Sequence, residues 1–501
     1  MTRLKTVTIL ILFATLFALV SASAVTGLPQ RPQRRKQTDL WRKQPPKAEA
    51  PRPFNLPSPR EIKLENGLTL VLIEDHRSPM VSFRVGIPLE FAAGDIAELT
   101  NQIALAEATA ELITEGAGSR TSEQLSREIE MLGGRISSSA NDDFAEVAAL
   151  VVAENADRML DLLGDVLLRP TFPETEVALY KRNRIQNLVV QRQDPAFLVG
   201  EQFDRVIFGS HPYGISAPTP AAVGALNRAK IAGSYNSSFS PNGSVVIIVG
   251  DFDASRMESK AREVLSGWKP SEKKSTGPRS PIESPQQPAR QVYLIDRSGS
   301  EQADFRIGSL AVKRSDADYF PLLVANAILG AGTSSRLFMN IRERKGYAYD
   351  VSSSVDALRL AGTFFGGAET RTEVTVPAIK EMLAEFDRIR EVKVTPRELQ
   401  EAKNYLNGLF ALSLATQGGI AERTMQTYIL GLGREYLESY RPRIEAVTAE
   451  QLQNAARKYM ITDKPVVVVV GDASKLAKEL ESVGRVSIFD IEGKPLKQSV
   501  R

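Results

Sequence analysis

The sequence predicts an α+β fold made of two homologous domains, each an antiparallel-rich sheet covered by helices. The first observation is an internal repeat, because the strand and turn of Ser240–Asp253 (SPNGSVVIIVGDFD) recur in Thr462–Ser474 (TDKPVVVVVGDAS). The second is a proline before a helical segment in each half, Pro173 and Pro396. The third is length, because about 430 residues of globular composition exceed one ordinary core. Duplication of one domain explains all three.

Changes of composition place the boundaries of these domains. A further repeat, of Ile136–Ser139 in Val351–Ser354, has a slightly different spacing, which indicates a short insertion between the repeats. Residues rich in Pro, Ser, Lys and Gly between the halves are typical of a flexible connector. The predicted order is a signal peptide (1–24), a disordered linker rich in Pro and basic residues (25–60), an N-terminal domain (61–268), an interdomain linker (269–291), a C-terminal domain (292–490) and a tail (491–501).

The first residues have the form of a secretion signal. Arg3 and Lys5 precede an almost wholly apolar run, Val7–Val20, and the small residues of Ala22–Ala24 are suited to cleavage. The apolar run is shorter than a membrane span requires, and an uncleaved anchor is the alternative. The chain contains no cysteine, so it has no disulfide, no lipid anchor on cysteine and no thiolate ligand for zinc. We therefore expect a periplasmic or secreted bacterial protein.

The segment after the signal carries most of the positive charge. Residues 1–60 contain eleven Lys and Arg against Asp39 and Glu49, whereas the whole chain has a net charge of only +3. The remainder is therefore acidic on balance, and the basic character belongs to the tail. We expect no nucleic-acid partner, and membrane contact only through the signal segment or the basic tail.

The N-terminal domain begins with a predicted hairpin. Asn66-Gly67 lies between two alternating apolar runs, which is the pattern of a tight two-residue turn. A third strand is expected at Val81–Ile87, and a helix at Ala97–Glu115.

The stretch Ser334–Asp356 (SSRLFMNIRERKGYAYDVSSSVD) is the most informative part of the C-terminal domain. A helix with a serine cap is expected first, and Gly346 is a plausible left-handed stop for it. The apolar positions of this helix recur at helical spacing: Leu337, Phe338 and Ile341. Tyr347–Val355 then alternates aromatic or β-branched residues with small polar ones, which predicts a strand.

Arg342 and Tyr349 lie on either side of this turn. A helix that stops at a glycine and enters a strand folds back, so the two side chains can point into the same space. Together they could donate hydrogen bonds to a peptide carbonyl or a developing oxyanion. The alternative is two independent, solvated residues at the ends of their elements.

The run Arg342–Tyr349 (RERKGYAY), preceded by GAGTSSRLF, resembles the insulinase/pitrilysin family of inverted zinc peptidases, in its mitochondrial-processing-peptidase-like branch. That branch carries an Arg and a Tyr at this separation. The resemblance extends from about residue 60 to about residue 490 and implies a clam-shell peptidase fold, in which two similar halves face each other across a chamber. It also implies that Arg342 and Tyr349 bind substrate beside a zinc site held in the other half.

The zinc motif of such peptidases is missing. The motif His-x-x-Glu-His places two imidazoles on one face of a helix, with the glutamate as base. This chain has two histidines, His76 and His211, and neither has a second histidine at helical spacing. His211 has no recognisable partnering acid or nucleophile nearby, so we expect a structural hydrogen bond for it. His76 follows Glu74-Asp75 at the end of a predicted hairpin, and we expect its side chain to be exposed.

The resemblance places the lost motif on Glu107–Glu111, so that Glu107 and Glu111 replace the two histidines and Ala110 replaces the catalytic glutamate. The third ligand falls near Asn187, where a carboxylate is required. All four positions have lost their chemistry, and we expect no metal and no other cofactor in this chain. A harder cation held by the two glutamates is the alternative, although carboxylates four residues apart are ordinary on helices.

Two other patterns are open to more than one interpretation. Gly330-Ala331-Gly332 before a helix suggests a phosphate loop, but no Gly-Lys-Ser/Thr follows and the preceding segment is helical in pattern, so packing explains it better. The serine-rich strands, Ser137–Ser139 and Ser352–Ser354, lack the histidine that a nucleophile needs. By the resemblance they could pair with an extended substrate; the alternative is an ordinary strand in the sheet interior.

The resemblance favours one function. In this hypothesis the chain is the non-catalytic, Arg/Tyr-bearing subunit of an exported heteromeric zinc metallopeptidase. A partner chain with an intact His-x-x-Glu-His holds the zinc, and the substrates are peptides. The chain is then not active alone. A structural or scaffold homologue without peptidase work is the alternative. Retention of Arg342 and Tyr349 favours the first hypothesis.

Overall fold

The computed structural model describes residues 57–91, 94–271 and 289–496. The expected signal peptide and nearly all of the basic linker after it lie outside the described residues, as does most of the expected interdomain linker. Within the described ranges, no helix combines the length and the apolar character needed to cross a membrane.

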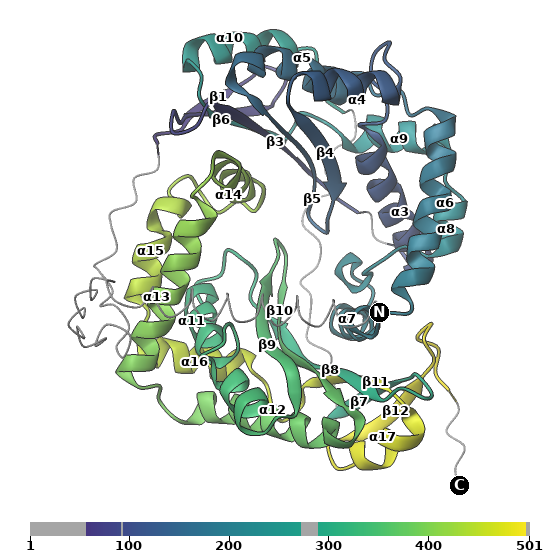
Figure 1. The fold of residues 1–501 in the computed structure, drawn as a ribbon, viewed down its shortest axis with the longest axis vertical. Helices are drawn as coiled ribbons and strands as arrows, with labels where there is room; N and C mark the ends of the chain where they lie inside the picture. Colours follow the sequence, from purple (N-terminus) through teal and green to yellow (C-terminus); the bar gives the residue numbers. More distant parts are fainter. Residues whose placement is uncertain (1–56, 92–93, 272–288, 497–501) are drawn as a thin grey trace, which may run out of the picture. The chain divides into compact units, whose positions relative to one another are not determined.

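Two six-stranded mixed sheets form the framework of the chain (Figure 1). In spatial order the first sheet consists of β1 (Arg60–Lys63), β2 (Thr69–Glu74), β6 (Val245–Gly250), β3 (Met80–Pro88), β5 (Phe144–Val152) and β4 (Arg135–Ala140). The second consists of β12 (Arg485–Phe489), β7 (Gln291–Asp296), β11 (Val466–Gly471), β8 (Gln302–Ala311), β10 (Gly362–Arg371) and β9 (Ala348–Ala357). The sheets confirm the predicted fold class.

Helices cover both sheets. In the N-terminal half these are α3 (Ile96–Leu112), α4 (Ser122–Met131), α5 (Ala156–Leu168), α6 (Glu174–Gln191), α7 (Pro195–Phe208), α8 (Pro220–Gly224), α9 (Arg228–Ser238) and α10 (Ala254–Leu265). In the C-terminal half they are α11 (Tyr319–Leu329), the π-helix η3 (Phe338–Arg344), α12 (Thr375–Glu391), α13 (Pro396–Ser413), α14 (Gln417–Ile429), α15 (Tyr436–Ala446), α16 (Ala449–Tyr459) and α17 (Ala473–Leu480). Short 3-10 turns, among them η2 (Pro212–Gly214), join some of them.

The internal repeat appears directly in the strand order. The repeated Gly-Asp segments end β6 and β11, which are wholly buried and take the same place in their sheets. Pro173 precedes α6 directly, and Pro396 is the first residue of α13. At this position the missing N–H of proline costs the helix no hydrogen bond. The predicted hairpin is present as well, with Gly67 at a φ of 89° between β1 and β2. Strand, turn and helix therefore recur as the sequence predicted.

One face of the first sheet packs on its own half. Val81, Phe83 and Val85 of β3 are fully buried and join the core under α3 and α5. Figure 1 shows α4, α5 and α10 on one side of this sheet and α14 on the other. Because successive side chains point to opposite faces of the sheet, β3 packs on the core of its own half with one face and on α14 with the other.

Each sheet is also covered by a helix from the other half of the sequence. Helix α14 packs on β3 and β6, where a Cβ at Gly86 would lie 2.9 Å from side-chain atoms of Met425 and Ile429. Helix α7 packs on β8 and β11 of the second sheet. The Gln417 side chain closes the first contact, donating to the carbonyl oxygens of Asp75 at 2.7 Å and Ser78 at 2.9 Å. The two halves are thus interlocked through their helices.

Candidate functional site

Arg342 lies on the π-helix η3, where the sequence predicted an ordinary helix. Lys345 donates its N–H to the carbonyl of Asn340, five residues earlier, at 3.1 Å. Apolar residues three and four apart fit both helix types, so their spacing could not reveal the wider turn. Gly346 ends the helix at a φ of 64°, as predicted, and the chain enters β9.

The π-helix is fixed to α12 by polar contacts. Asn340 Nδ2 donates to Glu381 Oε2 and to Glu385 Oε1, each at 3.0 Å. Lys345 Nζ lies 3.0 Å from Glu381 Oε1, and this ion pair, with the Asn340 bond, lowers the pKa of Glu381. The backbone that carries Arg342 is therefore held in place by contacts in which the Arg342 side chain takes no part.

Strand β9 is fixed to α11 by Ser353. Ser353 Oγ donates to Asn326 Oδ1 at 2.7 Å, and Asn326 Nδ2 donates to the Ser353 carbonyl at 3.1 Å. A Cβ at Gly330 would lie 2.3 Å from Ser353 Oγ, so glycine permits this close approach. Gly330 thus serves packing, in agreement with the interpretation preferred over a phosphate loop.

The structure brings Arg342 and Tyr349 together. The Arg342 guanidinium carbon lies 4.8 Å from the centroid of the Tyr349 ring and 4.6 Å from that of Phe338. Tyr349 is 82% exposed and the Arg342 side chain 34% exposed. Glu343 Oε1, at 3.6 Å from Arg342 Nε, is the carboxylate that pairs with it. Two aromatic faces therefore orient the guanidinium, and its N–H groups and the Tyr349 hydroxyl remain accessible as donors.

Both serine-rich strands lie at the edges of their sheets. β4 is the last strand of the first sheet, and β9 is the last strand of the second. The alternative that placed them in the sheet interior is therefore wrong. Sequence patterning could not decide this, because a serine-rich strand fits either place, and strand order is set by packing. An edge strand has backbone donors and acceptors that are available to another extended chain.

An ion pair lies where the resemblance placed the metal ligands. Glu107 is on α3, and Arg184 on α6 donates to its Oε2 from Nη2 at 2.8 Å and from Nε at 3.2 Å. Both side chains are largely buried, at 16% exposed for Arg184 and 20% for Glu107. Burial raises the pKa of Glu107, and Arg184 opposes that rise. The Arg184 guanidinium thus already pairs with the Glu107 carboxylate, which a metal cation would need as a ligand.

The other predicted positions surround the same place but do not complete a metal site. Glu111 and Asn187 line a cavity of about 330 Å³ with Arg184. Burial raises the pKa of Glu111, and nearby Glu107 adds to the rise. Ala110 is fully buried in the core. In the described part of the chain no group of three or more His, Asp or Glu residues is placed to hold a metal. The residues do not fit a catalytic zinc, because imidazole ligands are lacking and a guanidinium cannot be deprotonated.

Sequence reasoning missed Arg184. The signal was present in KRNRIQNL, because Arg184 precedes Asn187 by almost one helical turn and so shares its face. What was absent was any indication that this face of α6 meets Glu107.

The two histidines have structural roles. His211 Nδ1 accepts the Tyr213 N–H at 3.2 Å and caps η2, as expected. His76 is exposed, as expected, and its Nδ1 lies 2.6 Å from Asp251 Oδ1, a contact that raises the pKa of His76.

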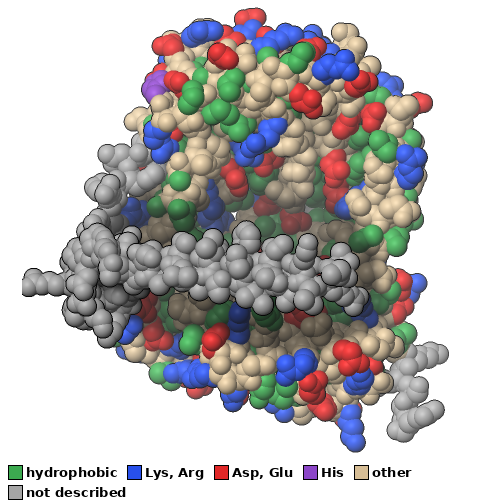
Figure 2. Space-filling view, viewed as in Figure 1, with side chains coloured by type: hydrophobic (Ala, Val, Ile, Leu, Met, Phe, Trp, Pro, Cys, Tyr) green, Lys and Arg blue, Asp and Glu red, His purple; other side chains and the backbone are tan. Residues whose placement is uncertain are grey.

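Figure 2 shows basic and acidic side chains interspersed on the visible face.

These features define a class of protein, a two-domain peptidase fold with an Arg/Tyr pair and without its zinc ligands. Residues 71–216 match the family model described as insulinase (peptidase family M16), and residues 225–406 match the model described as the peptidase M16 inactive domain. The chain belongs to the insulinase (M16) peptidase family. Its C-terminal match is to the model of the inactive domain, and its N-terminal half lacks His-x-x-Glu-His.

Several bacterial proteins are similar over most of their length. An uncharacterized zinc protease of Streptomyces coelicolor is 25% identical over 370 residues, which cover 72% of this chain and 79% of that protein. The uncharacterized zinc protease YmxG of Bacillus subtilis is 23% identical over 409 residues, with 81% of this chain and 96% of YmxG covered.

Solved structures agree on the fold. A peptidase M16 inactive domain from Pseudomonas fluorescens has a TM-score of 0.74 at 24% identity, covering 83% of this chain and 98% of that one. A protease from Helicobacter pylori has a TM-score of 0.76 at 17% identity, covering 83% of this chain and all of its own (100%). The predicted clam-shell peptidase fold is therefore confirmed.

Proposed function

We propose that this chain is the non-catalytic, substrate-binding subunit of an exported heteromeric zinc metallopeptidase. It supplies Arg342 and Tyr349 to a peptide bond that is cleaved at the zinc site of a homologous partner with an intact His-x-x-Glu-His. One observation carries the proposal: the Arg342 guanidinium lies 4.8 Å from the Tyr349 ring with both groups accessible, in a chain whose own metal position is taken by an ion pair.

The pair is suited to the negative charge that peptide hydrolysis creates. When water adds to a peptide carbonyl, its oxygen gains charge, and donors positioned in advance stabilise that charge. Arg342 contributes a guanidinium that stays charged, and Tyr349 contributes one hydroxyl. The partner's zinc supplies the activated water. In this arrangement the present chain binds and orients the substrate.

The edge strands suit an extended peptide. β9 begins at Ala348, one residue before Tyr349, so a peptide paired with the start of its outer edge runs past the Arg/Tyr pair. Farther along this edge the backbone of Ser353 is already bonded to Gly330 and Asn326. Main-chain hydrogen bonds to such an edge bind peptides of many sequences. The substrates are therefore peptides in extended form, recognised mainly through their backbone.

The proposed location is the periplasm or the exterior of a bacterial cell. It rests on the charge, apolar run and small residues of the first 24 positions. The basic segment that follows could touch anionic lipid, and no nucleic-acid partner is proposed.

Co-expression with an exported homologue that contains His-x-x-Glu-His tests this proposal. We expect the two chains to elute together in size-exclusion chromatography and to cleave peptides that neither cleaves alone. If this chain elutes at the same volume with and without the zinc-bearing homologue, the proposal is contradicted. A stable complex whose activity is independent of Arg342 and Tyr349 would favour the scaffold hypothesis.

A further inference from the structure

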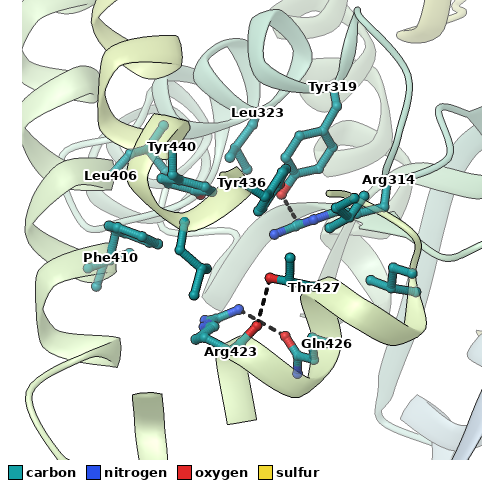
Figure 3. A pocket seen from close by; sticks show the side chains of 14 residues that line it. Arg314, Tyr319, Leu323, Leu406, Phe410, Arg423, Gln426, Thr427, Tyr436 and Tyr440 are labelled. Carbon is teal, nitrogen blue, oxygen red and sulfur yellow. Dashed lines mark hydrogen bonds between the residues drawn. The ribbon is translucent and has the colours of Figure 1, made fainter. Parts of the chain in front are cut away.

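A separate pocket lies in the C-terminal half, among α11, α13, α14 and α15 (Figure 3). Its cavity measures about 250 Å³. Two arginines and a group of aromatic side chains line it, and Figure 3 shows them entering the same space: Arg314, Arg423, Tyr319, Tyr436, Tyr440 and Phe410. None of these residues belongs to the Arg342/Tyr349 site or to the lost metal position.

Arg314 is held against aromatic rings. Its guanidinium carbon lies 4.2 Å from the centroid of the Tyr319 ring and 5.7 Å from that of Tyr436, and its Nη1 donates to the Tyr319 hydroxyl. Its Nε is buried and has no hydrogen-bond partner among the described residues. Aromatic stacking orients a guanidinium, but it does not satisfy all five N–H donors.

Arg423 is the second cation of the pocket. Its Nη1 donates to Gln426 Oε1 at 3.3 Å, a neutral acceptor on the same helix. The residues that line the pocket include no Asp or Glu. Among the described residues neither Arg314 nor Arg423 forms an ion pair. Two positive charges in a partly buried site without a counter-charge are costly unless an anion joins them.

The rest of the wall is apolar. Phe410 and Tyr440 stack with centroids 4.2 Å apart, and leucines from α11, α13, α15 and the segment after α14 complete the surface. A guanidinium pairs a carboxylate through two parallel hydrogen bonds, and the aromatic and leucine side chains favour a hydrocarbon body. An amine in the same ligand would find no carboxylate partner in the lining.

We propose that this pocket binds a small carboxylate with an apolar body and no free amine, held between Arg314 and Arg423. Two sources share this chemistry: a free short-chain organic acid, and the carboxyl end of a peptide, whose nitrogen is acylated. The cavity volume suits a ligand of the size of hexanoate or N-acetylleucine.

Isothermal titration of the full chain tests the proposal. Hexanoate represents a free acid, N-acetylleucine represents a peptide end, and hexylamine is the cationic control of similar shape. We expect one of the two carboxylates to bind and hexylamine not to bind, and the tighter carboxylate identifies the source. Binding of neither carboxylate at millimolar concentration, or equal binding of hexylamine, would overturn the proposal.

Two variants locate the site. Arg423→Gln should weaken carboxylate binding by roughly tenfold or more, which is the effect of losing a charged hydrogen bond. Leu409→Trp, at a half-exposed position in the wall, should block the cavity without changing its charge. The control Arg397→Gln, in an exposed ion pair with Glu401 on α13, should bind like the wild type. Unchanged affinity in both pocket variants would refute the site, and melting temperatures confirm that each variant is folded.

Discussion

Arg184 donates two hydrogen bonds to Glu107, at 2.8 Å and 3.2 Å, and so joins α6 to α3 where the resemblance placed metal ligands. A guanidinium supplies the positive charge that balances the carboxylate in the absence of a metal ion. This ion pair links the two helices directly, without a metal ligand from either.

The first prediction is that the purified mature chain binds no stoichiometric zinc and cleaves no peptide alone. The reason is that His76 and His211 make other contacts, and among the described residues no group of three or more His, Asp or Glu is placed to hold a metal. Elemental analysis after dialysis is the measurement. About one zinc per chain, with proteolysis that a chelator stops, would show that the prediction is wrong.

The second prediction is that Arg184→Met lowers the free energy of unfolding by about 1–3 kcal/mol, because it leaves the Glu107 carboxylate buried without its partner. Urea unfolding measures the change. Adding Glu107→Gln to this variant should recover much of the loss, since the uncompensated charge is then removed.

A matched control for this experiment is Arg127→Met. Arg127 pairs with Glu123 on the exposed face of α4, with side chains 68% and 80% exposed. Such a pair is worth less than about 1 kcal/mol. Equal losses for Arg184→Met and Arg127→Met would mean that the buried pair has no special role.

The third prediction concerns pH. Burial on α7 raises the pKa of Asp204 to about 6; Arg306 and the Ser216 hydroxyl oppose the rise, and Asp356 adds to it. Because the folded state favours the protonated form, the stabilisation is present below about pH 4, the usual Asp range, and is lost as the pH rises through about 6.

Asp204→Asn should remove this dependence. The variant should gain on the order of 2 kcal/mol relative to the wild type between pH 4 and pH 7, because each pKa unit corresponds to about 1.4 kcal/mol. Denaturant unfolding at a series of pH values measures the difference. Parallel profiles for the two proteins would show that Asp204 does not titrate as described.

Much of the fold follows from local sequence pattern. The repeated strand, the proline before each helix and the glycine turns all have short-range causes, and the structure contains each of them. The packing of α14 on the first sheet and of α7 on the second was not predictable, because it depends on contacts between residues hundreds of positions apart. The edge position of β4 and β9 has the same origin.

The candidate site was predictable only in part. A glycine stop between a helix and a strand was enough to place Arg342 near Tyr349. The π-helical turn and the Arg184–Glu107 pair were not visible, because apolar spacing does not fix the hydrogen-bond pattern of a helix and a single arginine on a helix does not reveal its partner.

The most direct test of the proposed function is the kcat/KM of the complex with its zinc-bearing partner, measured for Arg342→Ala and Tyr349→Phe. Each variant should lose roughly a hundredfold, about 3 kcal/mol, because each removes a donor aimed at the developing negative charge. Arg344→Ala and Tyr347→Phe, nearby changes of the same kind, serve as controls and should retain activity. Both pair variants should still co-purify with the partner. Wild-type kcat/KM in both variants would contradict the account, and failure to assemble would show that the pair is structural.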